Sequence, residues 1–300
     1  MADFAPIAGK PLALADDLQL VLAPNPSPMT YLGTNTYIIG RDTLAIIDPG
    51  PDDPTHLAAL VAVIAGRPVS HILLTHSHLD HSPLAGPLRD RLGAPTYAFG
   101  DSHAGRSEIM QQLAGEGLAG GGEGIDHRFA PDHALKDGEV LSGAWGDITT
   151  LHTPGHIGNH LCFGWKDAIF TGDHVMGWSS SLVSPPDGDL SDFMSSCTKL
   201  QDHDARVYYP GHGAPVTQPA ARLAWLIDHR KKREAQIIAA LTTKPATPAQ
   251  ITQAVYQDLA PGLMYAAERN VFAHLVDLYK RGKISAAPQL ATGALFALRA

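Results

Sequence analysis

The chain has 300 residues, 44% of them hydrophobic and 17% charged, a composition typical of a globular protein with a sizeable core. No apolar run reaches the roughly 18 to 20 residues of a spanning helix, Met1–Lys10 lacks the pattern of a signal peptide, and two cysteines exclude a disulfide framework; we therefore expect a cytoplasmic protein without membrane segments. The net charge of −8 is uneven, since residues 219–300 carry 11 Lys/Arg against 5 Asp/Glu and residues 1–218 carry 11 against 25.

From about Leu18 to Gly213, short runs rich in β-branched residues alternate with helical patterns, which indicates a layered arrangement of helices and mixed sheets. We predict strands at Tyr37–Ile39, Leu44–Ile47, His71–Leu74, Ile148–Leu151, His160–Phe163, Ala168–Phe170 and Val207–Tyr209, and helices at Pro54–Ala65 and Leu190–Leu200. The glycine-rich segment Gly115–Gly124 predicts a surface loop, either a tolerated insertion or a flap beside the site.

After residue 218 the pattern changes to helices, at Ala220–Leu241, from a capping box at Thr247 to about Leu259, and at Ala266–Arg281. A short hairpin is expected within Ile284–Leu298. These are the ingredients of a winged-helix module. Together with the change of charge, they predict two domains, residues 1–218 and 219–300.

The chemistry is concentrated in Thr75-His76-Ser77-His78-Leu79-Asp80-His81, directly after a predicted strand. Side chains in a loop at a strand end can converge, and imidazole with carboxylate suits zinc and other first-row divalent metals. Three further candidates lie in glycine-flanked turns after later segments, namely His156, Asp173 and His212. Asp48, in a turn after a strand, and Thr75 are candidates to support the histidines through hydrogen bonds.

These motifs resemble the metallo-β-lactamase superfamily over roughly Leu18–Gly213. The resemblance implies an α+β fold, an αββα sandwich with the site at one edge between two sheets, followed by a small C-terminal winged-helix-like domain. It implies a first metal on His76, His78 and His156, a second on Asp80, His81 and His212, and Asp173 bridging the two. Zinc is the expected metal, with manganese and iron left open.

The reaction then expected is hydrolysis by a metal-bridging hydroxide, with Asp80 as the catalytic residue that orients the nucleophile and helps to move its proton. Several other residues near the motifs are not expected to be metal ligands. His160 and His174 adjoin ligands, Trp178 and Ser179–Ser181 are candidate pocket residues, Asp189 is a candidate helix cap, and Cys162 and Cys197 are expected in the core.

The substrate is less defined than the reaction. The segment from Thr247 to Ile284 resembles the winged-helix tail of the β-lactamase-like-protein-2 group, which also resembles glyoxalase II and includes an endoribonuclease of single-stranded RNA. We expect a small ester or thioester as substrate, with single-stranded RNA and a non-catalytic binding module as alternatives. The basic run Arg230–Arg233 would either contact phosphates or form a solvated helix face. The oligomeric state stays open.

Overall fold

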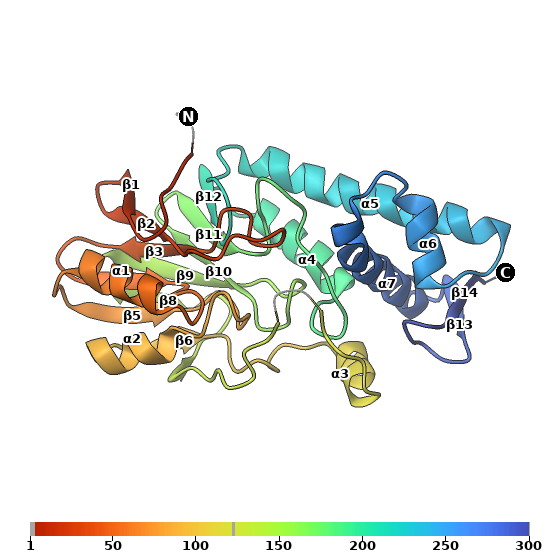
Figure 1. Ribbon diagram of the computed structural model, residues 1–300, viewed down its shortest axis with the longest axis horizontal. Helices are drawn as coiled ribbons and strands as arrows, with labels where there is room; N and C mark the ends of the chain where they lie inside the picture. Colours follow the sequence, from red (N-terminus) through yellow and green to blue (C-terminus); the bar gives the residue numbers. More distant parts are fainter. Residues whose placement is uncertain (1–3, 122–123, 300) are drawn as a thin grey trace.

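The computed structural model describes residues 4–121 and 124–299. In Figure 1, two sheets and their flanking helices occupy the left of the molecule, and the C-terminal helices with a small hairpin occupy the right. The first sheet contains, in spatial and chain order, β1 (Pro11–Ala15), β2 (Leu18–Leu22), β3 (Asn35–Ile39), β4 (Leu44–Ile47), β5 (Val69–Leu73), β6 (Thr96–Ala98) and β7 (His133–Ala134). The second contains β8 (Val140–Gly143), β9 (Gly146–His152), β10 (Leu161–Trp165), β11 (Ala168–Gly172) and β12 (Val207–Pro210), and here too consecutive strands are neighbours.

Both sheets are mixed, antiparallel along β1–β4 and β8–β11 and parallel from β4 to β7 and between β11 and β12. Their inner faces share one core, in which Tyr37 and Leu73 of the first sheet meet Phe163 and Phe170 of the second. The parallel strands end at one edge, so the turns that follow β4, β5 and β11 bring their side chains together there.

Helices cover the outer faces. Helices α1 (Pro54–Ile64) and α2 (Ala85–Leu92) pack on the first sheet. Helix α4 (Leu190–Gln201) and the start of α5 (Pro219–Thr243) pack on the second. The layers therefore confirm the predicted α+β sandwich. Asp189 caps α4 through Ser191 N, as predicted.

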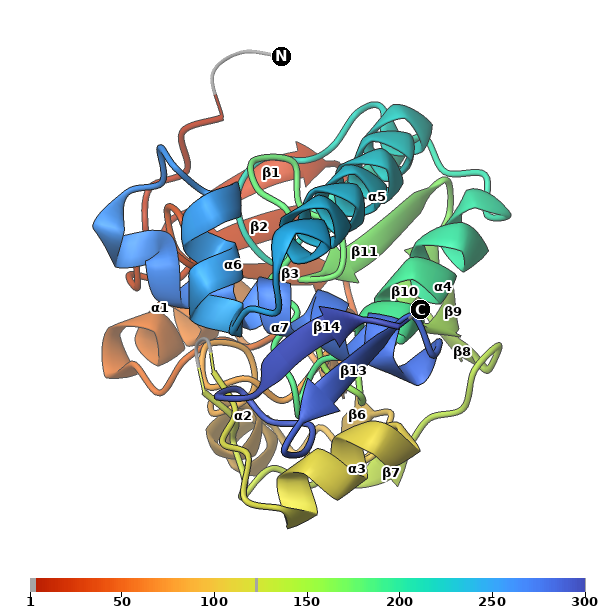
Figure 2. The same ribbon diagram turned by 90° about the vertical axis from the view of Figure 1, so that its right-hand side faces the viewer.

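The C-terminal elements form a separate core with α3 (Glu108–Gly115). They are α6 (Pro248–Val255), the short 3-10 helix η1 (Pro261–Leu263), α7 (Met264–Lys280), β13 (Ile284–Ala287) and β14 (Leu295–Leu298). Figure 2 shows α5, α6, α7 and the hairpin in front of the sheets. Since α5 contributes Leu223 to the core of the second sheet and Ile237 to the C-terminal core, it joins the two bodies. The division at residues 218 and 219 stays a prediction.

Several predicted boundaries need correction. Helix α6 ends at Val255 rather than near Leu259, and α7 begins at Met264, two residues before the predicted start. The predicted glycine-rich loop starts later than expected, because Gly115 is the last residue of α3. Of that loop, residues 122 and 123 lie outside the described part of the chain. The capping box of Thr247 and Gln250 is confirmed. No described helix combines the length and the apolar character required to cross a membrane.

Candidate metal centre

The loop after β5 places two histidines against a third from a distant turn. His78 Nδ1 lies 3.0 Å from His76 Nε2 and 3.0 Å from His156 Nε2. All three side chains are buried, and one ligand atom from each lies within 4.8 Å of the other two. This first set, His76, His78 and His156, can hold one metal ion.

A second set consists of Asp80, His81 and His212. Asp80 Oδ2 lies 3.3 Å from His81 Nε2 and 3.1 Å from His212 Nε2, and the two imidazole nitrogens are 3.3 Å apart. One ligand atom from each of these residues also lies within 4.8 Å of the other two, so the three residues can hold another ion.

Asp173 lies between the two sets. Its Oδ2 atom is 3.2 Å from His212 Nε2 and 3.8 Å from His156 Nε2, while Oδ1 is 3.4 Å from His81 Nε2. One carboxylate therefore faces both sets, which is the position that the resemblance assigns to a bridging ligand. The structure thus brings all seven predicted metal ligands together.

Asp48, in the turn after β4, binds the loop that carries the metal ligands. It has a positive φ of 52° and accepts hydrogen bonds from Thr75 N at 2.7 Å, from Thr75 Oγ1 at 2.6 Å and from His81 Nδ1 at 2.9 Å. A histidine whose second nitrogen is held in this way has a fixed tautomer and ring orientation. The predicted supporting roles of Asp48 and Thr75 are consistent with these contacts.

Backbone carbonyls hold two other rings. The second nitrogen of His156 donates to Leu182 O at 2.7 Å, and that of His212 donates to Gly33 O at 3.1 Å. Close backbone approach requires glycine at position 211, where an added Cβ would lie 2.4 Å from Asp173 Oδ1 and 2.7 Å from His81 Cε1. The glycine-flanked turns therefore allow dense packing around the site.

The two sets differ in electrostatics. Burial lowers the pKa of His78 to about 3, and His156 acts in the same direction, so the first set is neutral at pH 7. In the second set burial lowers the pKa of His212, but Asp173 and Asp80 outweigh it and raise that pKa to about 10. For Asp80 the contributions have the opposite signs. Burial raises its pKa, but His81 and His212 outweigh burial and hold the pKa well below its ordinary value.

The donor set fits divalent cations. Asp80 Oδ1 and Asp173 Oδ1 are buried and have no hydrogen-bond partner among the described residues. Orphaned carboxylate oxygens among converging imidazole nitrogens are unfavourable unless a cation or a proton lies between them. A pair of divalent ions would satisfy these atoms, and nitrogen and oxygen donors do not by themselves select zinc over manganese or iron.

A cavity of about 250 Å³ opens beside this cluster. His78, His156 and Asp173 line one end, which we call the ligand end, and residues of α5, of the segment after α6 and of α7 line the other. Trp178 and two of the three predicted serines, Ser179 and Ser180, line it as expected. Sequence reasoning missed the remote lining residues His229, Arg233, Tyr256, Leu259, Leu263, Ala266, Ala267 and Asn270. Their only sequence signal was the position of Arg233 in the basic run.

Other histidines and both cysteines have different surroundings. Thr153 Oγ1 lies 3.0 Å from His160 Nδ1, and His174 Nε2 lies 3.5 Å from Cys197 Sγ, so neither histidine lines the cavity. Cys162 and Cys197 are buried in the core, as expected. His103, His127, His133 and His203 are exposed and His71 is half-buried.

The four residues of the basic run on α5 do not share one environment. Lys231 and Lys232 are exposed, but Arg230 is 3% exposed and donates to Asn270 Oδ1 at 2.8 Å and to Ser181 O. Because Arg230 lies inside the fold and Arg233 lines the cavity, the interpretation of residues 230–233 as a solvated helix face is wrong for these two arginines.

Comparison with known proteins agrees with this architecture. The family described as "Metallo-beta-lactamase superfamily" matches residues 29–212, and "Beta-lactamase associated winged helix domain" matches residues 247–291. The chain is 29% identical over 276 residues to "Beta-lactamase-like protein 2 homolog" of Drosophila melanogaster, covering 88% of each chain. It is 31% identical over 229 residues to "Atrochrysone carboxyl ACP thioesterase" of Aspergillus fumigatus, covering 74% of this chain and 64% of that one. The solved structure of a beta-lactamase domain protein from Burkholderia ambifaria shares the fold, with a TM-score of 0.80 at 21% identity over 99% of this chain and 96% of that one.

Proposed function

Because this chain belongs to the metallo-β-lactamase superfamily, we propose that it is a binuclear metal-dependent hydrolase of a small thioester or ester. The observation that carries the proposal is the arrangement of seven buried ligands at the end of a largely apolar cavity of about 250 Å³. A cavity of this size and lining suits a small acyl group rather than a polymer.

The residues would divide the work as follows. His76, His78 and His156 would hold one ion, Asp80, His81 and His212 the other, and Asp173 would contact both. When bound, such ions supply Lewis acidity and a water that ionises near neutral pH. Asp80 would orient this water by accepting a hydrogen bond from it, because its Oδ1 atom is buried and has no partner in the described chain. Asp48 would keep His81 in the required orientation.

Relatives support the thioester as the first choice. One relative of 31% identity is named a thioesterase, and its similarity covers 74% of this chain. A thioester carbonyl is an electrophile that a small apolar cavity can hold beside the ligand end. We propose zinc as the metal to load first, because imidazole and carboxylate are its usual nitrogen and oxygen ligands, and manganese and iron are the alternatives for the same donors.

Cleavage of single-stranded RNA is the alternative, and one surface observation favours it. On α5 the exposed Trp225 stacks on His229, with ring centroids 4.9 Å apart, and Arg222 lies 4.3 Å from the Trp225 ring centroid. Aromatic rings beside cations can stack bases. A second stack, of the exposed rings of Tyr31 and Trp178 with centroids 5.0 Å apart, lies at the ligand end, where Trp178 lines the cavity. We place RNA second because the cavity beside the metal ligands is small and largely apolar. A non-catalytic binding module leaves the buried ligand set unexplained.

The test uses zinc-loaded protein with a panel of acyl thioesters and with single-stranded RNA. We expect thioester turnover that falls about 1000-fold in His78→Ala, together with loss of bound zinc, since metal catalysis supplies several kcal/mol. His103→Ala, at an exposed histidine, is the matched control and should behave as wild type. Absence of thioester turnover, or turnover unchanged in His78→Ala, would overturn the proposal. RNA cleavage that His78→Ala abolishes, without thioester turnover, would establish the alternative.

A further inference from the structure

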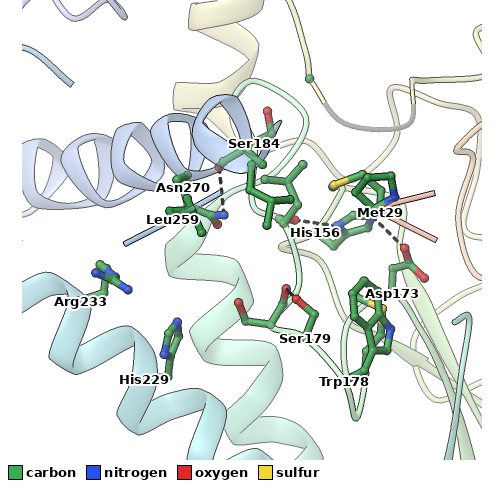
Figure 3. Close-up of a pocket in the computed structure, with 18 of the residues that line it drawn as sticks. Met29, His156, Asp173, Trp178, Ser179, Ser184, His229, Arg233, Leu259 and Asn270 are labelled. Carbon is green, nitrogen blue, oxygen red and sulfur yellow. Dashed lines mark hydrogen bonds and ion pairs between the residues drawn. The ribbon is translucent and has the colours of Figure 1, made fainter. Parts of the chain in front are cut away.

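The end of the cavity opposite the metal ligands carries a positive charge. His229 and Arg233 line it from α5, and Figure 3 shows both side chains across the cavity from His156 and Asp173. They are four residues apart on one helix and therefore project from the same face. We call this region the α5 end.

Arg233 has only neutral partners among the described residues. Its Nη1 donates to Gln236 Oε1 at 2.8 Å and to Val255 O at 3.3 Å, and its guanidinium carbon lies 3.8 Å from the ring centroid of Tyr256. Its Nε atom is buried without a hydrogen-bond partner, and no described carboxylate forms an ion pair with it.

The described charged groups near Arg233 do not compensate its positive charge. Arg230, buried behind the cavity wall, also has only neutral partners in the described chain, Asn270 Oδ1 and Ser181 O. Among the described residues, two carboxylates line the cavity and both are engaged elsewhere, Asp187 with Arg106 at 2.8 Å and Asp173 within the metal-ligand cluster. Burial lowers the pKa of His229, and Arg230, Arg233 and Arg222 lower it further, as a net positive environment requires.

An unpaired guanidinium in a partly buried, mostly apolar wall loses hydration without regaining it from a counter-charge. A ligand that brings a carboxylate or a phosphate would complete the pairing, because the planar guanidinium can donate two parallel hydrogen bonds to either group. Most of the cavity lining is apolar, with Leu182 next to His156 and with Leu259 and Leu263 on the side of the C-terminal helices. The fitting ligand therefore has an apolar middle and an anion at one end.

We propose that Arg233, with His229 beside it, binds an anionic group of the substrate, so that the enzyme selects thioesters whose apolar segment ends in a carboxylate or a phosphate. The inference rests on the proposed function, because the cleaved carbonyl must lie at the ligand end. The anion has two possible sources, the far end of the acyl chain or the leaving thiol. Both present the same chemistry to Arg233.

The test compares three matched thioesters on zinc-loaded protein, one neutral, one with a carboxylate at the far end of the acyl chain, and one with a phosphate on the thiol. Arg233→Met removes the charge and keeps an apolar stem over Tyr256, while Arg233→Lys restores a charge. Lys231→Met is the control for a lost charge at an exposed position of the same helix. We expect Arg233→Met to lower kcat/KM about tenfold for one anionic substrate, through KM, and to leave the neutral one unchanged. The substrate that responds identifies the source of the anion.

Equal effects of Arg233→Met on neutral and anionic thioesters would overturn the inference and leave the proposed hydrolase intact. If no thioester is turned over, equilibrium binding of hexanesulfonate to the zinc-loaded protein decides, since a sulfonate is a weak ligand for divalent metals. We then expect about tenfold weaker binding to Arg233→Met and near wild-type binding to Arg233→Lys and Lys231→Met. Unchanged binding in Arg233→Met would overturn the inference in that case.

Discussion

The two ends of the cavity are built in different ways. At the ligand end, His76, His78, Asp80 and His81 come from one loop, are buried and have defined partners. The α5 end gathers mostly half-buried side chains from α5, from α7 and from the segment between α6 and α7, and its arginine, Arg233, lacks a counter-charge among the described residues. Under the proposed function, a compact local motif would hold the metal ions, whereas long-range packing of the C-terminal helices would determine which substrates bind.

One segment connects the two ends. Ser181 donates through its hydroxyl to Asp173 O, and its own carbonyl accepts from Arg230. Asn270 of α7 accepts from Val183 N at 3.1 Å and from Arg230 Nη1. The comparison therefore predicts that substitutions at the ligand end change metal binding and turnover, while those on α5 and α7 change substrate binding and leave the metals in place.

The largest effect is expected from Asp48→Ala at the ligand end. The change leaves Thr75 N and His81 Nδ1 without their acceptor, so we expect metal affinity and turnover to fall about 10- to 100-fold. Metal content after dialysis and kcat on the preferred thioester measure it. The matched control is Asp53→Ala, which removes the N-cap of α1, loses about 1 kcal/mol of stability and should leave metal content unchanged. Equal metal loss in both variants would mean that general destabilisation, not Asp48, controls the site.

The next prediction concerns pH, which should change the metal affinity of the second ligand set more than that of the first. His212 has a pKa of about 10 and that of His81 is raised too, because Asp80 and Asp173 outweigh burial, so metal must displace their protons. We expect the second set to lose about tenfold in affinity for each proton displaced as pH falls by one unit, from about 7 to 6. His78 of the first set stays neutral in this range, since burial lowers its pKa to about 3, and burial also lowers the pKa of His76 and of His156. Metal analysis at fixed free zinc should therefore show one equivalent retained and one released, and parallel loss of both would contradict the distinction.

A smaller effect is expected from Asn270→Ala at the far wall. Arg230 Nη1 and Val183 N lose an acceptor, which loosens the segment that lines the cavity without touching a metal ligand. We expect KM to rise about five- to tenfold, as for the loss of one or two hydrogen bonds, with metal content as in wild type. Gln257→Ala, at an exposed position, is the control. A fall in kcat with loss of metal would break the separation between the two ends.

The sequence predicted the ligand end well because its information is local. Four ligands lie within six positions after a buried strand, and His156, Asp173 and His212 each follow a segment that ends at the same edge. The packing that joins the edges is set by the family fold, which the motifs were sufficient to indicate. Short or weakly patterned elements, such as β6, β7 and α2, gave no comparable signal.

The α5 end could not be predicted in the same way. Arg230 and Arg233 stand in one basic run with Lys231 and Lys232, and only the contacts of α5 with α7 and with the cavity decide which of the four is buried. Tyr256 and Leu259 lie beyond the end of α6, whose predicted end was wrong, so their direction could not be inferred. Residues whose placement depends on tertiary contacts between distant segments carry no local pattern.

The smallest expected effect lies outside both ends, at Asp192 in the first turn of α4. Burial, followed by Asp189, raises its pKa from 3.8 to about 6. Folding therefore favours the protonated acid, and its contribution to stability is present below pH 3.8 and is lost as pH rises through 6. After discounting for solvent screening of this half-buried group, Asp192→Asn should gain about 1 kcal/mol over wild type at pH 8 and little at about pH 4.5.

Melting of metal-free protein at the two pH values measures this difference, and about 2 °C is expected at pH 8. Chelation keeps pH-dependent metal release at the ligand end out of the comparison. Asp204→Asn, at an exposed position after the same helix, should change the melting temperature equally at both pH values. A pH-independent gain in Asp192→Asn would assign the effect to helix propensity rather than to the buried carboxylate, because the amide differs from the acid in propensity at every pH.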